Sequence, residues 1–369
     1  EGASKLYHES KLDTLVIIAP NGVHPNWPKR QAPLWLTIPY DSIVWDDTRN
    51  TKRWKDKLAA LLKRTDCLRI IAINVEAFQN IKGNGYKFIL NILSSNSASA
   101  MLVIDESSTI KSPKANRSKQ IVALSHIASY RRILTGTPVT QGPFDIWAQG
   151  EALKKNIWNK NFYMFKQHHG QFRIARFGNR SFEELVSYRH LEELRERIAE
   201  FASEVIKADC MDLPPKVYEI IEVELTPEQK KSYKQMLDYY ATEVDGALIT
   251  TDTPLVKLTK LHQITTGHIL DEDHNVHLIP HNRLKTLTDT LERISDKVII
   301  FCQYVQPIKE IMDALGSDAV EYSGRISDTK RQENIDAFQN SDKTKYIVIS
   351  LQSSGAYGLD LYSAGTVIY

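Results

Sequence analysis

The stretch "MLVIDESSTIKSP" (residues 101–113) places two acidic side chains, Asp105 and Glu106, directly after an apolar run. An apolar run that contains β-branched residues is typical of a strand buried in a parallel sheet. A charge at the end of such a strand is unfavourable unless it has a partner. Ligands of parallel α/β sheets bind just beyond the carboxyl ends of the strands, which is where this pair is expected to lie.

The acidic pair has two interpretations. A nucleotide-bound Mg²⁺ needs oxygen ligands, and ATP hydrolysis needs a carboxylate that orients and activates water. Asp105 would then face the water shell of the metal, and Glu106 would face the attacking water. In the other interpretation, Asp105 caps the next turn and Glu106 is solvated.

The alternation of apolar runs and helical patterns predicts the architecture. Strands separated by helices of this length favour parallel sheets with crossover helices. Apolar runs occur at 14–20, 68–75, 100–106, 130–138, 297–303, 318–324, 345–351 and 366–369. Helical patterns are predicted at 51–64, 112–127, 181–202 and 226–244, and a single strand at 213–225. We therefore expect an α/β domain over 1–143, a mostly helical insertion and linker over 144–281, and a second α/β domain over 282–369.

Composition excludes several classes of protein. The 369 residues are 42% hydrophobic and 25% charged, as in ordinary globular domains. No apolar stretch approaches the roughly 20 residues of a membrane span. The three cysteines, Cys67, Cys210 and Cys302, lack metal-ligand spacing and argue against a disulfide framework. A net charge of +2 means that any nucleic-acid binding must come from local patches.

A second polar strand end follows in "RRILTGTPVTQGPFDIWAQ" (131–149). Thr135, Gly136 and Thr137 let a loop pass close to neighbouring groups and hydrogen-bond to them, although alone they could form an ordinary turn. Together with the acidic pair, this segment resembles motifs II and III of superfamily-two helicases. The phrase "DESSTIKSP…RRILTGTPVTQGPFDIWAQ" is most similar to the Swi/Snf-type branch, the duplex-DNA translocases related to chromatin remodellers.

Further segments resemble motifs of this branch in the same order. "TLVIIAPNGVHPNW" resembles motif Ia, "IIAINVEAF" motif Ib, "KVIIFCQYVQPIKEI" motif IV and "ISLQSSGAYGLDLYSAGTVIY" motif V. "EYSGRISDTKRQENIDAFQN" resembles the segment after motif IV. The resemblance implies that DNA contacts Asn21, Gly22, His24, Trp27, Asn74, Gln303, Tyr304, Ser323 and Gly324. Basic residues beside motif II, Lys111 and Arg117, could add phosphate contacts or could belong to a solvated helix face. The resemblance assigns nucleotide binding to Thr135, Gly136, Thr137, Gly355, Gly358 and Asp360.

The resemblance implies two RecA-like domains that use ATP and Mg²⁺, the metal being held by Asp105 through water. The activity would be a DNA-dependent ATPase whose hydrolysis drives movement along the phosphate backbone of double-stranded DNA, without sequence specificity. A small stand-alone enzyme of bacterial or phage type is expected, monomeric and cytoplasmic, in the nucleoid or in an infected cell, with no membrane partner.

The sequence also departs from this branch. Ser107-Ser108 replace the usual basic or histidine residue after the acidic pair, and Ser353-Ser354-Gly355-Ala356 replace Arg-Ala-Gly-Gly in motif V. No Gly-x-x-x-x-Gly-Lys-Ser/Thr loop for phosphate binding occurs. "GQFRIARFGNR" (170–180) imitates the arginine-bearing motif VI, but it precedes motif IV. We therefore expect these 369 residues to hydrolyse ATP poorly by themselves.

Three other functions remain open from the sequence. A strand-separating or branch-migrating helicase would use the same motifs. A catalytically silent DNA-binding module would lack a phosphate-binding loop altogether. A nuclease subunit ranks last, because no Asp…Glu-x-Lys constellation lies on a predicted strand.

Overall fold

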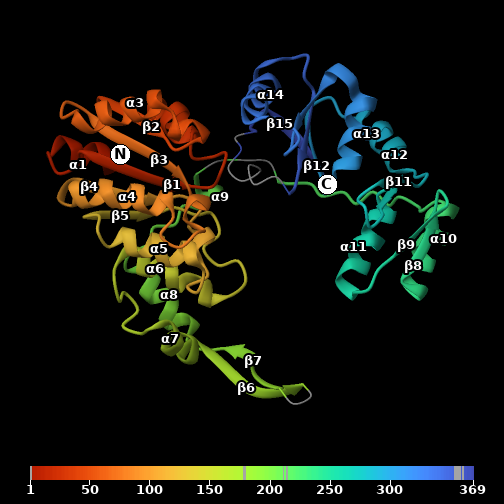
Figure 1. Cartoon of the computed structure of the whole chain (residues 1–369), viewed down its shortest axis with the longest axis horizontal. Coiled ribbons are helices and arrows are strands. Elements are labelled where there is room, and N and C mark those ends of the chain that lie inside the picture. Colours follow the sequence, from red (N-terminus) through yellow and green to blue (C-terminus); the bar gives the residue numbers. More distant parts are fainter. Residues whose placement is uncertain (1, 178–179, 211, 213–214, 353–358, 360) are drawn as a thin grey trace. The chain divides into compact units, whose positions relative to one another are not determined.

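The chain forms two compact units, Glu1–Leu213 and Pro214–Tyr369, in the computed structural model (Figure 1). The structure describes residues 2–177, 180–210, 212, 215–352, 359 and 361–369. Each unit contains a parallel sheet with helices packed on it, which confirms the predicted α/β class with two parallel sheets. The two units are described separately below.

Unit 1 is built on a five-stranded parallel sheet in the order β2-β3-β1-β4-β5. Its strands are β1 (Thr14–Ala19), β2 (Tyr40–Val44), β3 (Leu68–Asn74), β4 (Ala100–Ile104) and β5 (Tyr130–Ile133). Its helices are α1 (Gly2–His8), α2 (Ala32–Trp35), α3 (Lys52–Lys63), α4 (Asn84–Ser95), α5 (Asn116–Ser125), α6 (Ile146–Leu153), α7 (Phe162–His169), α8 (Leu191–Ala199) and α9 (Lys207–Cys210).

The two faces of this sheet are covered unequally. Alternate residues of β1, β3 and β4 pack on one face against α3, α4 and α5, where Leu61, Ile89 and Leu124 are buried. The other face, which includes Ile17 and Met101, packs against the short helices α1 and α2. Strands β1 and β4 are therefore apolar on both faces, as their uninterrupted apolar sequences predict.

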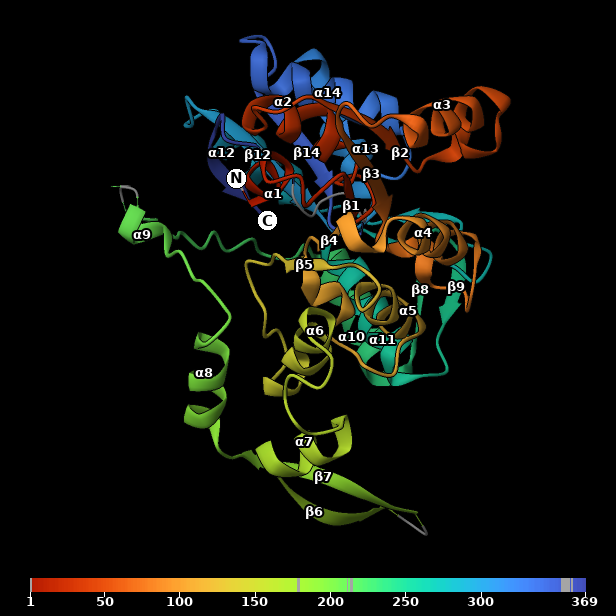
Figure 2. The ribbon, with the colours of Figure 1, turned by 90° about the vertical axis from the view of Figure 1, so that its left-hand side faces the viewer.

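A β-hairpin projects from α7 in unit 1 and was not predicted (Figure 2). It consists of β6 (Gly170–Phe177) and β7 (Arg180–Tyr188), whereas the sequence predicted a helix over 181–202. Cross-strand pairing explains the error, because β6 and β7 pair along their length, with Arg173 opposite Glu184 and their side chains 2.6 Å apart. Only the last part of the predicted helix, α8, is helical.

Unit 2 is built on a four-stranded parallel sheet in the order β13-β14-β12-β15. Its strands are β12 (Lys297–Cys302), β13 (Ala319–Tyr322), β14 (Tyr346–Ser350) and β15 (Ala364–Ile368), with the hairpins β8 (Ala241–Val244) and β9 (Ala247–Thr250), and β10 (His268–Leu270) and β11 (Val276–Leu278). Its helices are α10 (Pro227–Tyr239), α11 (Pro254–Thr265), α12 (Arg283–Leu291), α13 (Val305–Leu315) and α14 (Asp328–Asn340).

Helices cover both faces of this second sheet. Helices α12 and α13 pack on one face, and α14 packs on the other through Ile335 and Phe338. A separate small core joins α10 and α11 to the two hairpins, around Met236 and Ile264.

The predicted strand at 213–225 is wrong for the residues that the structure describes. Residues 215–226 form no strand. The side chains of Val217, Tyr218 and Ile220 are 91%, 86% and 90% exposed. An alternating apolar pattern cannot form a ladder without a neighbouring strand, and none pairs with this segment in the described structure.

The boundaries of the predicted helical insertion, 144–281, stay predictions. The division between the two units falls inside this segment, which contains hairpins as well as helices. Among the described residues, no helix is both long enough and apolar enough to span a membrane.

Gly267 is expected to be essential for the stability of unit 2. Its φ is +84°, and an added Cβ would lie 1.9 Å from the His281 ring. Gly267→Ala should therefore lower the free energy of unfolding of unit 2 by about 1–3 kcal/mol or more. Because all six tryptophans lie in unit 1, circular dichroism should report this loss while tryptophan fluorescence does not change.

Gly324→Ala is the matched control, because a Cβ at Gly324 would meet open space. Equal stability of the Gly267→Ala and Gly324→Ala variants would contradict the expected strain.

Candidate functional site

The strand order of unit 1 places the acidic pair at a switch point of the sheet. Strand β1 pairs with β3 on one side and with β4 on the other, so that the chain leaves β1 in one direction and later returns on the opposite side. In open parallel sheets, ligands bind in the crevice at the carboxyl ends of two such strands. Asp105 follows β4 at this position, and its backbone N–H donates to the carbonyl oxygen of Ile18 in β1 at 2.8 Å.

Both oxygens of Asp105 accept a hydrogen bond. The indole Nε1 of Trp27 donates to Oδ2 at 2.8 Å, and the backbone N–H of Glu106 donates to Oδ1 at 3.0 Å. Trp27 thus connects the loop after β1, which resembles motif Ia, to the acidic pair. The resemblance to motif Ia implies a DNA-side role for Trp27 and does not predict this contact.

Glu106 is held in an unusual backbone conformation beside Asp105. Its φ is +47° and its ψ is +56°, the left-handed region that a non-glycine residue adopts at a cost of about 1–3 kcal/mol. The carboxyl group is half-buried and accepts no side-chain cap hydrogen bond. Burial, and next the charge of Asp105, raise the pKa of Glu106 above its usual value. A half-buried carboxyl with a raised pKa at a ligand-binding edge has the properties of a general base.

Gln149 connects the segments after the acidic pair and after β5. It is fully buried, and its Oε1 accepts from the Ser107 hydroxyl at 2.7 Å. Its Nε2 donates to the carbonyl oxygens of Pro138 and Asp145, at 2.7 and 2.9 Å. The sequence did not predict this role, although Gln149 is the last residue of the "FDIWAQ" segment of the motif.

Asp145 holds the loop after the predicted nucleotide-binding residues. Its Oδ2 accepts from the backbone N–H groups of Thr140 and Gln141 and from the Thr140 hydroxyl. Burial raises the pKa of Asp145, but these hydrogen bonds outweigh it, so that the pKa lies below its usual value. Lys111 joins this loop, because its Nζ donates to Thr140 Oγ1 at 2.5 Å.

The predicted nucleotide-binding residues of motif III follow the carboxyl end of β5. Thr135 is half-buried, and its Oγ1 accepts from the backbone N–H of Thr137 at 3.2 Å. Gly136 is exposed, and a Cβ there would meet open space. These groups remain accessible to a ligand. The motif V residues Gly355, Gly358 and Asp360 lie outside the described residues.

Three of the predicted DNA contacts of unit 1, Asn21, Gly22 and Asn74, lie at the carboxyl ends of β1 and β3. The backbone N–H of Asn21 and the Nδ2 of Asn74 both donate to Glu76 Oε2, at 3.2 and 3.4 Å. Gly22 lies in the same loop with φ of +83°. Arg117 lies elsewhere, in the first turn of α5.

His24 differs from the expected surface contact. Its side chain is only 4% exposed, and its Nε2 lies 3.0 Å from the carbonyl oxygen of Trp45. Burial lowers the pKa of His24, which favours the neutral ring. The structure therefore corrects the expected DNA contact through the His24 side chain, because the ring is buried beneath the loop.

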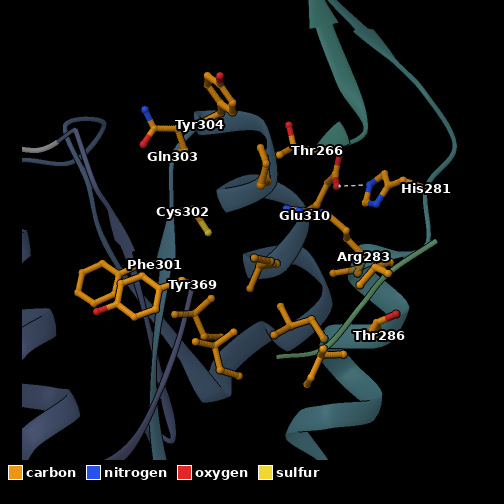
Figure 3. Close-up of a pocket in the computed structure, with 18 of the residues that line it drawn as sticks. Thr266, His281, Arg283, Thr286, Phe301, Cys302, Gln303, Tyr304, Glu310 and Tyr369 are labelled. Atoms are coloured by element: carbon orange, nitrogen blue, oxygen red, sulfur yellow. Dashed lines mark hydrogen bonds and ion pairs between the residues drawn. The ribbon is translucent and has the colours of Figure 1, made fainter. Parts of the chain in front are cut away.

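The second sheet has its switch point between β12 and β15. Strand β12 pairs with β14 on one side and β15 on the other. A cavity of about 420 Å³ lies at their carboxyl ends, and its lining includes Cys302, Gln303, Tyr304, Glu310 and Tyr369 (Figure 3). Gln303 is exposed, as a ligand contact requires.

Polar pairs surround one end of this cavity. Tyr304 Oη lies 3.0 Å from His262 Nδ1. His281 Nε2 lies 3.0 Å from Glu310 Oε2 (Figure 3). Burial raises the pKa of Glu310, but the hydrogen bonds from His281 and Gln306 outweigh this effect and lower it overall. Burial raises the pKa of Cys302 to about 12, so that its thiol is unreactive at neutral pH.

Ser323 also differs from the expected surface contact. Its side chain is 1% exposed and its hydroxyl hydrogen-bonds to the Glu321 carboxylate, so that a DNA contact through this hydroxyl is corrected as well. The adjacent Gly324 is exposed.

The acidic pair is suited to hold a hydrated divalent cation. Carboxylate and hydroxyl oxygens are the ligands that Mg²⁺ prefers, and Mg²⁺ commonly keeps several waters. Asp105 already accepts two hydrogen bonds, which is compatible with a contact through water. The donor set at this edge therefore fits Mg²⁺.

Comparison with known proteins identifies two domain families. The family model of the SNF2-related domain matches residues 4–268, and that of the helicase conserved C-terminal domain matches residues 282–369. These matches confirm the resemblance to the Swi/Snf-type branch.

Individual relatives are distant. The DNA annealing helicase and endonuclease ZRANB3 of Homo sapiens is 22% identical over 362 residues, which cover 92% of this chain and 31% of the human protein. An uncharacterized ATP-dependent helicase of Mycoplasma pneumoniae is 26% identical over 279 residues, which cover 73% of this chain and 25% of that protein. The chain thus spans about a third or less of the length of these curated relatives.

One similar solved structure is the Sulfolobus solfataricus SWI2/SNF2 ATPase core in complex with dsDNA. It is 23% identical to this chain, with a TM-score of 0.41, and the match covers 99% of this chain and 72% of that one.

Gln149→Leu is expected to destabilise unit 1 while preserving side-chain volume. The substitution leaves the buried Ser107 hydroxyl without its partner, at about 1–3 kcal/mol, and also removes the hydrogen bond to the Pro138 carbonyl oxygen. Denaturant titration followed by tryptophan fluorescence measures the loss. Gln141→Leu is the control, because this exposed side chain should change stability by no more than about 0.5 kcal/mol. Equal effects of the two substitutions would show that Gln149 does not bridge the segments.

Proposed function

We propose, because this chain belongs to the SNF2-related family, that it forms the core of an ATP-dependent motor that moves along double-stranded DNA. The single observation that carries this proposal is Glu106, a half-buried carboxyl with a raised pKa beside Asp105 at the switch point of the first sheet. This is the position at which a parallel α/β sheet binds its ligand.

The chain's own residues divide the work of hydrolysis at this edge. Glu106 accepts a proton from the attacking water, and its raised pKa makes the carboxylate a stronger base than an exposed glutamate. Trp27 and the Glu106 backbone hold Asp105 in place. When bound, Mg²⁺ supplies positive charge that stabilises the transferring phosphoryl group. Asp105 would hold this ion through water, and Thr135 and Thr137 would lie on the nucleotide side.

DNA is held through its phosphates in this proposal. A motor that travels cannot depend on base edges, because phosphate contacts fix position without reading sequence. The residues proposed for these contacts are Asn21, Gly22, Asn74, Lys111, Arg117, Gln303, Tyr304 and Gly324. The side chains of His24 and Ser323 are omitted because they are buried. The motor is proposed to act as a monomer in the cytoplasm.

Glu106→Gln tests the hydrolytic role in the complete gene product. The amide keeps the shape of the carboxyl but cannot accept the proton from water, so DNA-stimulated ATP turnover should fall by roughly 10²–10⁴-fold. Binding of a fluorescent ATP analogue should be retained. In the native protein, the rate should decrease as the pH is lowered toward the raised pKa of Glu106, because the protonated carboxyl is not a base.

Glu196→Gln is the matched control, since Glu196 is an exposed carboxyl on α8. Turnover in the Glu106→Gln protein equal to that of the Glu196→Gln protein would refute the assignment of Glu106.

A further inference from the structure

Two helices of unit 1 meet at the base of the β6–β7 hairpin. The last turn of α7 leads directly into β6, and β7 leads into α8. The strand pair Gly170 and Tyr188 closes the base, and the Arg189 backbone N–H donates to the His169 carbonyl oxygen at 2.9 Å. This pairing brings side chains of α7 beside those at the start of α8.

Three side chains of the types that can bind a metal lie close together at this junction. They are His168 from α7, His190 before α8, and Glu193 in the first turn of α8. One nitrogen of each imidazole and one oxygen of the carboxylate all lie within 4.8 Å of one another. His168 Nε2 lies 2.8 Å from Glu193 Oε2, and the two imidazole rings stack with centroids 4.5 Å apart.

The chemistry of this set favours a particular class of ion. Imidazole suits Zn²⁺ and similar transition metals, whereas Mg²⁺ prefers an all-oxygen shell. Two histidines and one carboxylate are also a known type of ligand set for Zn²⁺, with a fourth position left for water. The neutral imidazole ring is the form that binds a metal.

We propose that His168, His190 and Glu193 form a binding site for a divalent transition-metal ion, Zn²⁺ in particular. The ion would join the end of α7 to the start of α8 and so fix the base of the hairpin. This site is separate from the acidic pair after β4 and does not depend on the proposed motor function.

Small side-chain movements would complete the site. Zn²⁺ bonds of about 2.0–2.2 Å require the ligand atoms to lie closer together than the present upper limit of 4.8 Å. His190 and Glu193 are exposed, so their side chains can move inward. Lys160 Nζ lies 4.0 Å from Glu193 Oε1, which leaves Oε2 on the side of the histidines.

Equilibrium dialysis of the untagged, chelator-treated chain against Zn²⁺ tests this site. We expect one ion per chain, and Zn²⁺ should raise the thermal midpoint that tryptophan fluorescence reports for unit 1. His190→Ala and Glu193→Gln should each weaken binding by about tenfold or more and remove most of this thermal shift. A large excess of Mg²⁺ should not displace the ion.

Two control variants address other Zn²⁺ ligands. Cys210 is the exposed cysteine, and His8 is an exposed histidine on α1. Cys210→Ser and His8→Ala should bind Zn²⁺ as the native chain does. The proposal is overturned if the native chain binds no stoichiometric Zn²⁺, or if His190→Ala and Glu193→Gln bind it as tightly as the controls.

Discussion

The order of strands in the two parallel sheets determines where this protein can bind ligands. All strands of each sheet run in one direction, so their carboxyl ends lie along one edge. In both units a central strand pairs on two sides with strands that occur later in the sequence, and open parallel sheets bind ligands at the carboxyl end of such a strand. The acidic pair lies at this position in unit 1, and the polar-lined cavity lies at it in unit 2.

Burial then gives the acidic pair its properties. Strand β4 is fully buried, so the first residues that can carry charge are those immediately after it. Asp105 is satisfied by two hydrogen-bond donors, whereas Glu106 lies half-buried next to a like charge. Two adjacent carboxyls with different surroundings can therefore perform different tasks. The left-handed backbone of Glu106 is consistent with a position maintained for function.

The sequence predicted the parts of the fold that depend on local pattern. Each predicted apolar run became a strand of one of the two sheets. The central strands β1 and β4 are buried on both faces, as their uninterrupted apolar sequences require. Strand β2 was missed, since Asp41 and Ser42 interrupt its apolar pattern and it is only partly buried. The β6–β7 hairpin was missed because its charged residues have good helix propensity, and cross-strand pairing overrides that propensity.

For the candidate site as well, the sequence predicted only what a local pattern specifies. Asp105 and Glu106 were found because they directly follow a strand. The contacts that hold the site join residues distant in sequence: Trp27 and Asp105 are separated by 78 positions, and Ser107 and Gln149 by 42. No local pattern specifies such pairs. The burial of His24 and Ser323 was likewise invisible, because a histidine or serine after a strand is equally compatible with surface and core.

The most direct test of the proposed motor is a triplex-displacement assay with the complete gene product. A third DNA strand is annealed in the major groove of one end of a blunt duplex, and its release is followed with and without ATP. The account predicts release that requires ATP while the two strands of the duplex remain annealed. Hydrolysis of ATP without release of the third strand, or separation of the duplex strands, would contradict movement along intact duplex DNA.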